Sequence, residues 1–370
     1  MTQHPSAVPA GTPRALPGLV PLTAETSAAI SVARTLCITF MIAVHFWPGD
    51  VRIMAAEKPL WLEGFYWLLL DQLGRASVPL LSVVSGVLLT CSYARRPRPR
   101  AIITGKLRSL IVPMAGWSAA LLAFLALRSF AAGQPVELPQ TAMGWINALF
   151  GVTKPPANFP LTFLRDMFVT CLIALAFLKL YERTRPVAIL ALMLIWLVEV
   201  QTTGFMLFRP QILSFFALGM GLALAGHANY RPGWGAVAGI LAIYAVLSVL
   251  PEDPVPGMQM DTSLLSHVPR AAMSLLMWKC ALEITRARGW LFRATHQLAP
   301  HIFVVYCSHA LTIAAVAVLG AFGISERSPI YPLVFLLQYP LCLGVGVALS
   351  RALSWAVSMP LRRRMRSEAS

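Results

Sequence analysis

The chain has 370 residues, of which 57% are hydrophobic and 12% charged, and its mean hydropathy is +0.68. Soluble globular domains carry about 25% charged residues, so this composition excludes a soluble body as well as a disordered, fibrous or disulfide-stapled chain. The 30 Lys and Arg residues outnumber the 15 Asp and Glu residues, which gives a net charge of +15. In so apolar a chain this basicity favours a membrane, and not a nucleic acid, as the partner.

Stretches of roughly 20 mostly apolar residues, the length that crosses a bilayer as a helix, recur along the whole chain. The segment 60–73 is shorter and aromatic, and it is predicted to lie in the outer membrane interface. The sequence therefore predicts an all-α, polytopic integral membrane protein with about ten transmembrane helices around a polar internal cavity. The predicted spans lie near 26–47, 77–93, 109–130, 161–181, 186–203, 211–225, 234–250, 263–285, 301–322 and 330–357.

Basic residues are concentrated in alternate segments between the spans, as Lys and Arg are in cytoplasmic loops. The even number of spans places both termini on the same side of the membrane. The distribution of basic residues indicates that this is the cytoplasmic side. Residues 1–25 are rich in Pro, Ala and Thr and are expected to be a disordered cytoplasmic tail, not a cleavable signal peptide. Residues 26–358 are expected to form the membrane domain, and residues 359–370 a basic cytoplasmic tail.

The first span contains two ionisable residues, Arg34 and His45. Such side chains cost several kcal/mol at membrane depth, so each is a candidate functional residue. Their spacing of eleven residues returns to within about 20° of the same helix face and separates them by about 16 Å along the axis. Both are therefore expected to line a hydrated channel. The alternative is that Arg34 pairs with another helix and that His45 is a polar cap beside Trp47.

The second span is expected to begin, on the outer side, at Arg75. At Lys106 and Arg108, before the third span, a basic inner mouth suits the phosphate groups of coenzyme A, although basic residues also flank spans by topology alone. The outer loop 131–160 includes a short apolar segment, 144–150, that is predicted to cap an outer cavity.

Later spans carry further ionisable residues on the outer side or at mid-membrane: Arg165, Asp166, His267, Arg270 and His309. Arg165 and Asp166 point about 100° apart on a helix, so one is expected to face the cavity while the other braces a neighbour. A hydrogen-bonded structural histidine remains the alternative for His267 and His309.

Two features of the later spans are predicted to be structural only. Lys279 and Glu283 have the i,i+4 spacing of a helical ion pair. The cysteines are expected to be packing residues, and the sequence shows no metal-ligand spacing, so no metal is expected. The six cysteines are Cys37, Cys91, Cys171, Cys280, Cys307 and Cys342.

Several short motifs, in this order and on the expected sides of the membrane, together resemble the membrane acyltransferase-3 family over residues 26–357. They are Arg34-x10-His45, Arg75 with Val78-Pro79-Leu80 and Ser85-Gly86, Lys106-x-Arg108 through Pro113, the segments 163–168 and 215–220, and Tyr306-x-Ser308-His309.

The resemblance implies transfer of an acyl group from cytoplasmic acyl-CoA to a sugar hydroxyl. Acetyl is the expected acyl group, and succinyl is the alternative. It implies that His45 is the catalytic histidine and Arg34 its partner, and that Lys106 and Arg108 bind the donor. Here the chain departs from the family's Arg-x-x-Arg donor motif, because Gly105 stands three residues before Arg108.

Some members of the family use an appended periplasmic domain to complete the transfer, which this sequence does not show. The protein is therefore expected to act alone or to hand the acyl group over to a separate protein. The local sequence around Arg34 and His45 resembles that of family members associated with bacterial exopolysaccharide synthesis. The resemblance therefore implies a multi-pass protein of the bacterial inner membrane, with the bilayer, acyl-CoA, a polysaccharide or lipid-linked sugar and other polysaccharide-synthesis proteins as partners.

The expected chemistry needs a base and charge stabilisation. Histidine, with an unperturbed pKa near 6.5, suits the base role, so His45 is expected to activate the hydroxyl or to carry the acyl group. Arg75 and Arg165 are expected to stabilise the oxyanion or position the sugar, with Asp166, Arg270 and His309 as further support for acceptor, oxyanion or cavity.

Two other functions remain open on the residues alone. A transporter or flippase of a sugar or lipid-linked intermediate accounts equally well for the internal charges, but it predicts inverted repeats that the sequence does not show. A polyprenyl-phosphate-dependent glycosyltransferase predicts a pair of acidic residues in the first outer loop, where Asp50, Glu57 and Glu63 are scattered.

Overall fold

The computed structural model describes residues 19–45, 64, 67–197, 208–248, 264–316 and 331–367, and this part of the chain contains helices, turns and no strand. The all-α prediction is therefore confirmed. The helices are α1 (Ala24–His45), η2 (Trp67–Gly74), α3 (Arg75–Arg95), α4 (Pro99–Lys106), η3 (Leu107–Ile111), α5 (Val112–Ala131), α6 (Ala142–Phe150), η4 (Phe159–Leu161), α7 (Thr162–Arg183), α8 (Arg185–Leu197), α9 (Pro210–Leu224), α10 (Trp234–Ser248), α11 (Leu264–Ala287), α12 (Trp290–Leu298), α13 (Ile302–Val316) and α14 (Tyr331–Ser367).

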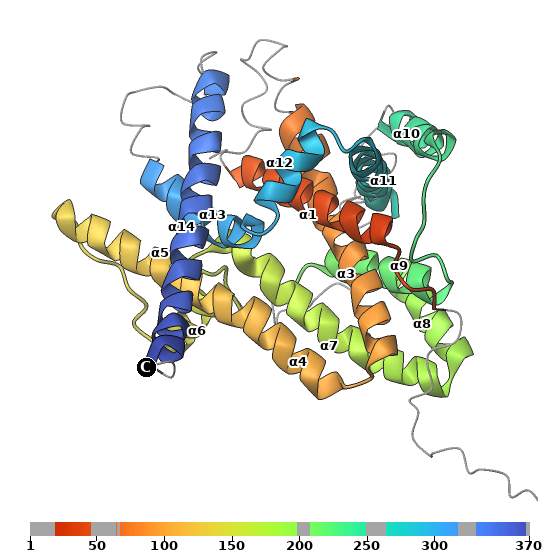
Figure 1. Cartoon of the computed structure of the whole chain (residues 1–370), viewed down its shortest axis with the longest axis horizontal. Coiled ribbons are helices and arrows are strands. Elements are labelled where there is room, and N and C mark those ends of the chain that lie inside the picture. The colour runs from red at the N-terminus through yellow and green to blue at the C-terminus, as the bar shows by residue number, and fades with distance from the viewer. Residues whose placement is uncertain are drawn as a thin grey trace, which may run out of the picture.

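Helix α1 lies in the middle of the assembly and packs against α3, α11, α12 and α13 (Figure 1). Its apolar residues are buried along most of its length, as expected of a central helix in a bundle. Because α1 ends at His45, its C-terminal end brings this side chain among the neighbouring helices.

Helices α3 and α9 approach each other more closely than ordinary side chains allow. A methyl group on Gly86 would collide with the carbonyl oxygen of Phe216, and one on Gly219 would collide with the carbonyl oxygen of Val83. Small residues permit this backbone contact in membrane helices, where van der Waals packing drives association. Two family-like motifs, around 85–86 and 215–220, therefore serve the packing of this helix pair.

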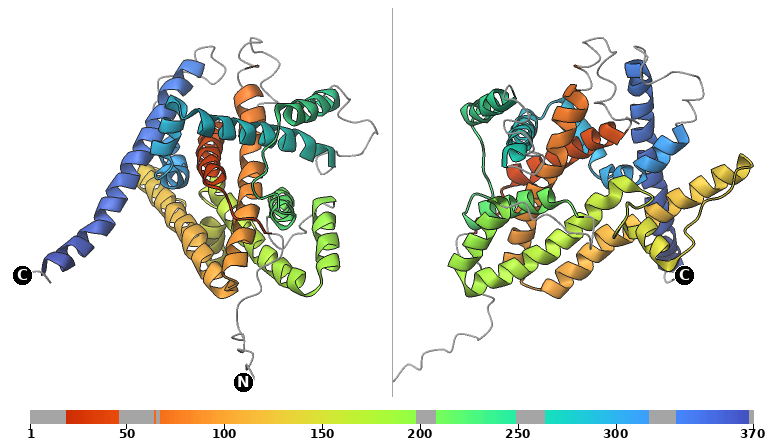
Figure 2. Two further views of the ribbon diagram at one scale, coloured as in Figure 1. Left: turned by 45° about the vertical axis from the view of Figure 1, so that its right-hand side comes forward. Right: turned by 180° about the vertical axis from the view of Figure 1, so that it is seen from behind.

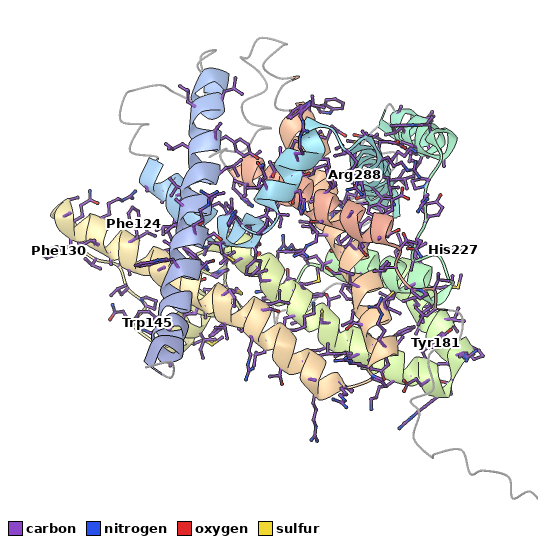
Figure 3. All side chains as sticks on the ribbon, viewed as in Figure 1. Phe124, Phe130, Trp145, Tyr181, His227 and Arg288 are labelled. Atoms are coloured by element: carbon purple, nitrogen blue, oxygen red, sulfur yellow. The ribbon has the colours of Figure 1, made fainter. Side chains whose placement is uncertain are left out.

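Helices α4, η3 and α5 form one run of 33 residues, Pro99–Ala131, that begins earlier than the predicted third span. Only 17% of the most apolar 18-residue stretch of this run is buried against the rest of the protein. Figure 3 shows Phe124, Phe130 and Trp145 along the arm that α5 and the adjacent α6 form at one side of the molecule. Such exposed apolar surface is the surface that lipid covers in a membrane protein.

Among the described residues, four helical segments are long and apolar enough to cross a membrane, and the bent pair α12–α13, with an angle of 73°, makes a fifth if it counts as one span. The described parts of α8, α9 and α10 are apolar but shorter. The spans predicted near 263–285 and 330–357 fall on helices α11 and α14, which are not among these candidate segments. The structure thus supports an integral membrane protein, while the number of about ten spans stays a prediction.

Helix α14 continues to Ser367, through most of the segment expected to be a basic tail. Figure 2 shows it along one side of the bundle, with its C-terminal end extending beyond the other helices. Most of the predicted N-terminal tail, and residues 60–63 and 65–66 of the interfacial segment 60–73, lie outside the described residues. Of the latter, Trp67–Gly74 begins within it as a π-helix that runs directly into α3.

Candidate active site

A buried ion-pair network lies at the N-terminal ends of α7 and α9. Asp166 is completely buried and is shared by two arginines. Arg165 donates from Nε (2.9 Å) and Nη2 (2.6 Å) to Asp166 Oδ1, while Arg209 donates from Nε to Asp166 Oδ2 (2.9 Å). Arg209 Nη2 also donates to Thr162 Oγ1 (3.2 Å). The long Arg165 side chain thus folds back onto its own neighbour, although the two residues leave the helix in different directions.

Arg209, the residue directly before α9, was not among the candidates from the sequence. It lies 43 residues from Asp166, and no periodicity connects a loop arginine with a distant helix. One property of the sequence could have identified Arg209 as a candidate. It lies on the expected outer side, and the enrichment of Lys and Arg in cytoplasmic loops does not explain an arginine there. Its side chain is 44% exposed, so part of the guanidinium remains accessible beside the buried carboxylate.

Two histidines from distant helices, His45 at the end of α1 and His309 in α13, lie next to each other. Their ring centroids are 5.2 Å apart with an angle of 36° between the planes. His309 is completely buried, and the ring of Tyr306 stacks on it at 5.6 Å. The positive charge of Arg209 lies near enough to act on both His45 and Tyr306. The structure therefore unites α1, α7, α13 and the start of α9 in one polar cluster.

Arg34 is placed differently. It shares helix α1 with His45, but its side chain is exposed, and within the described residues no hydrogen bond or ion pair connects the two. At the C-terminal end of the same helix, His45 lies against His309.

Lys106 and Arg108 flank the start of the π-helical turn η3, which packs against α7. Lys106 is half-buried and Arg108 is exposed. π-Helical turns within α-helices are frequent at functional sites. Neither residue is joined to the histidine pair by an interaction between described residues.

The remaining candidates lie at the interface of α9 and α11 or at the start of α3. His267 is buried and stacks on Phe215 at 5.6 Å. The amide oxygen of Gln211, in the orientation that satisfies both partners, accepts from Nη1 (2.7 Å) and Nη2 (3.1 Å) of Arg270. Arg75 is the first residue of α3, and its side chain lies outside the described part.

Two structural predictions from the sequence, the ion pair in α11 and the cysteines as packing residues, are also confirmed. Lys279 and Glu283 form the expected i,i+4 ion pair. All six cysteines are free thiols, five of them buried. Within the described ranges, no group of three or more His, Cys, Asp or Glu side chains is arranged to hold a metal ion.

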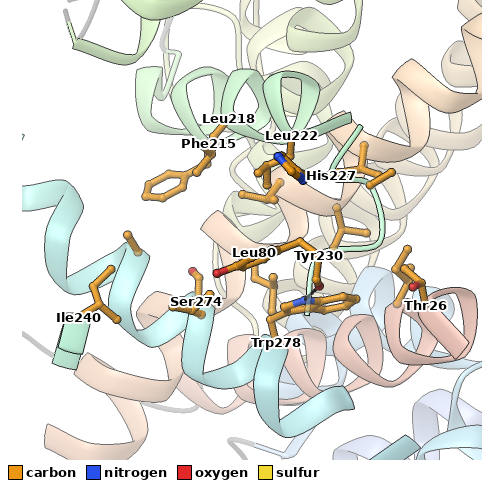
Figure 4. A pocket seen from close by; sticks show the side chains of 17 residues that line it. Thr26, Leu80, Phe215, Leu218, Leu222, His227, Tyr230, Ile240, Ser274 and Trp278 are labelled. Carbon is orange, nitrogen blue, oxygen red and sulfur yellow. Dashed lines mark hydrogen bonds between the residues drawn. The ribbon is translucent and has the colours of Figure 1, made fainter. Parts of the chain in front are cut away.

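A cavity of about 360 Å³ lies between α1, α3, α9, α10 and α11 (Figure 4). Its wall is mainly apolar, with Leu80, Phe215 and Leu218 among its residues, and Trp278 closes one side by donating to the carbonyl oxygen of Tyr230 (3.1 Å). None of the four residues of the ion-pair network and neither histidine of the pair lines it. The polar residues of the cluster thus pack against one another and not around this space.

The cluster combines the groups that acyl transfer requires. An imidazole can accept a proton from an attacking hydroxyl, and fixed guanidinium groups can stabilise an oxyanion. The buried carboxylate holds both guanidinium groups in place before any substrate binds, which is the arrangement that electrostatic catalysis needs.

Comparison with known proteins agrees with this chemistry. The acyltransferase domain of the acyltransferase-3 family matches residues 27–355. The succinoglycan biosynthesis protein ExoH of Rhizobium meliloti (strain 1021) is 28% identical over 236 residues, which cover 61% of this chain and 62% of that protein. No solved structure gives a significant match. Because the domain covers nearly the whole chain, this protein belongs to the acyltransferase-3 family.

Proposed function

We propose that this protein transfers an acyl group from acyl-CoA to a hydroxyl group of an exopolysaccharide sugar at the membrane. The observation that carries the proposal is the position of His45, which lies beside a second histidine and near the guanidinium group of Arg209. Membership of the acyltransferase family supports acyl transfer as the reaction. The relative named for succinoglycan biosynthesis supports an exopolysaccharide as the acceptor.

In this proposal His45 removes the proton from the acceptor hydroxyl, or carries the acyl group in a covalent intermediate. Arg209 and Arg165 stabilise the negative charge that develops on the carbonyl oxygen of the thioester. Asp166 keeps the two guanidinium groups in position, because each donates to a different oxygen of its carboxylate. His45 is thus the first residue whose loss is expected to abolish transfer.

The donor is proposed to approach from the opposite end of the helices. Lys106, which is half-buried, and Arg108, which is exposed, lie at a π-helical turn and are proposed to bind the donor phosphates. Arg34, also accessible and on the same helix as His45, is proposed to contact the donor between this mouth and the histidines. Arg75, Arg270 and the His267 region are proposed to support the acceptor side.

The proposed topology has both termini on the cytoplasmic side of a bacterial inner membrane. In that orientation the C-terminal end of α1 and the N-terminal ends of α7 and α9 all lie in the outer half, so the polar cluster is near the outer surface. Cytoplasmic acyl-CoA and an outer sugar then meet within the helix bundle. Both acetyl-CoA and succinyl-CoA remain proposed donors.

The test uses the purified full-length protein in lipid nanodiscs with acetyl-CoA or succinyl-CoA and a deacylated exopolysaccharide oligosaccharide. Release of the CoA thiol and gain of an ester on the sugar, detected by mass spectrometry, are the expected results. A His45→Ala variant is expected to form no ester while it remains monodisperse and inserted. His296→Ala is the matched control, because His296 is exposed on α12.

Two results would contradict this function. Ester formation by His45→Ala at the native rate would remove His45 from the reaction. The alternative is tested with the protein reconstituted in closed lipid vesicles. Movement of an unmodified glycan or lipid-linked sugar across the vesicle membrane, without release of CoA, would instead favour the transporter.

The donor mouth has a separate measurement. Lys106→Ala and Arg108→Ala are expected to raise the KM for acyl-CoA and to leave kcat nearly unchanged, because these residues are proposed to contact only the donor phosphates. Arg100→Ala, which removes another exposed basic residue from α4, is the control.

A further inference from the structure

The two ring nitrogens of His309 differ in their hydrogen bonding to the described residues. Its Nδ1 hydrogen-bonds to the carbonyl oxygen of Tyr306, one turn earlier in α13. Its Nε2 is completely buried and has no hydrogen-bond partner among the described residues. Buried polar atoms are nearly always hydrogen-bonded in folded proteins, so an atom left without a partner calls for a functional explanation.

The bond to Tyr306 determines which tautomer His309 adopts. A carbonyl oxygen can only accept, so Nδ1 must carry the hydrogen. In the neutral ring Nε2 then has a free lone pair and is a proton acceptor. His309 Nε2 is therefore a proton acceptor and not a hydrogen-bond donor.

The backbone that fixes this tautomer is itself anchored. Tyr306 donates through its hydroxyl to the carbonyl oxygen of Pro160 (2.7 Å), and the buried Asn158 donates to the carbonyl oxygen of Cys307 (3.4 Å). Both partners belong to the segment that leads into α7, the helix that carries Asp166. The ring of Tyr306 also stacks on His309. His309 is thus held by the same part of the chain that positions the ion-pair network.

His45 is the ring that lies next to His309. With ring centroids 5.2 Å apart, the two imidazoles are close enough for a proton to pass between them through one water molecule.

From this geometry we infer that His309 Nε2 is the second proton acceptor of the reaction and that His45 and His309 act as a two-histidine relay. The inference rests on the proposed acyl transfer and assigns a role that the family match and the relative do not give. His309 is then present in the site for its lone pair, and not as a packing residue.

The proton balance of the relay is complete. The oxygen of the acceptor hydroxyl forms a bond to the carbonyl carbon of the thioester, and its proton passes to one nitrogen of His45. The hydrogen on the other nitrogen of His45 passes to His309 Nε2. When the carbon–sulfur bond breaks, His45 gives a proton to the CoA thiolate and regains one from His309, so both rings end neutral and CoA leaves as the thiol.

The first test compares His309→Gln and His309→Asn with the native protein in the nanodisc assay, with the acyl-CoA that the native protein uses. Proton transfer by a positioned side chain contributes about 10²- to 10⁴-fold to a rate, so kcat is expected to fall by at least about 100-fold. The KM for acyl-CoA is expected to stay unchanged, because His309 does not contact the donor phosphates. His301→Gln is the matched control, since His301 lies just before α13 and bonds to Ser350 (3.0 Å).

The second test needs no variant, so it decides the question even if His309 is also required for folding. The native rate is measured in mixtures of H2O and D2O. Two protons in motion predict a curved dependence of kcat on the deuterium fraction, whereas one proton predicts a straight line. A straight line, or a folded His309→Gln variant with kcat within about threefold of native, would overturn the relay. Absence of any acyl transfer by the native protein would instead overturn the proposed function.

Discussion

Two regions of this molecule use the same arrangement of charges in opposite surroundings. In the candidate site, Asp166 is shared by Arg165 and Arg209 and is completely buried. At the beginning of α1, Glu25 is shared by Arg231 (2.6 Å) and Arg286 (2.8 Å), but its side chain is 30% exposed. In each cluster one carboxylate thus binds two guanidinium groups, at least one of which comes from a distant part of the sequence.

Burial gives these two clusters different physical roles. Exposed ion pairs contribute little because water screens them, whereas removing one member of a buried pair leaves an uncompensated charge in a medium of low dielectric. The Asp166 cluster therefore holds its charges in fixed positions beside the histidines. The Glu25 cluster is a partly exposed set of ion pairs at the surface. The difference shows that the surroundings of a charge, and not the type of contact, decide its importance here.

The largest expected effect is that of Asp166→Asn. This change preserves the shape of the side chain but leaves two arginines without their shared counter-charge, so it is expected to destabilise the fold by about 3–5 kcal/mol. The measurement is the midpoint of thermal unfolding of the purified protein in detergent. A midpoint equal to that of the native protein would show that the cluster is not effectively buried.

A smaller effect, on activity, is expected for Arg209→Gln. Loss of one positioned donor to an oxyanion costs about 10²-fold in kcat, and Arg209 is the accessible arginine of the buried cluster. Arg231→Gln makes the same change in the surface cluster and is expected to leave kcat unchanged. Equal kcat values for the two variants would remove Arg209 from the site.

The smallest effect is expected for Glu25→Gln. Its carboxylate is partly exposed and its partners are exposed by 40–42%, so the unfolding midpoint is expected to change little. Any difference from the native protein should disappear in 1 M salt, where the Debye length is about 3 Å. A destabilisation as large as that of Asp166→Asn would break the distinction between the two clusters.

Much of the site could be predicted from local sequence. Apolar segments with few charges predicted the helices, and rare ionisable residues within them identified His45, Arg165, Asp166 and His309 as candidates. The i,i+4 pair of Lys279 and Glu283 followed from helix geometry alone. These features depend on neighbours within one helix, which a sequence displays directly.

The tertiary structure alone decided which of these residues meet. Arg209 reaches Asp166 across 43 positions, and His45 meets His309 although they belong to the first and the penultimate helices. Arg34 is expected on the same helix face as His45, yet its side chain is exposed, whereas His45 lies against His309. The period of a helix fixes where a side chain points relative to its own axis. Which helix stands opposite, and over what length, depends on packing such as the close contact at Gly86 and Gly219.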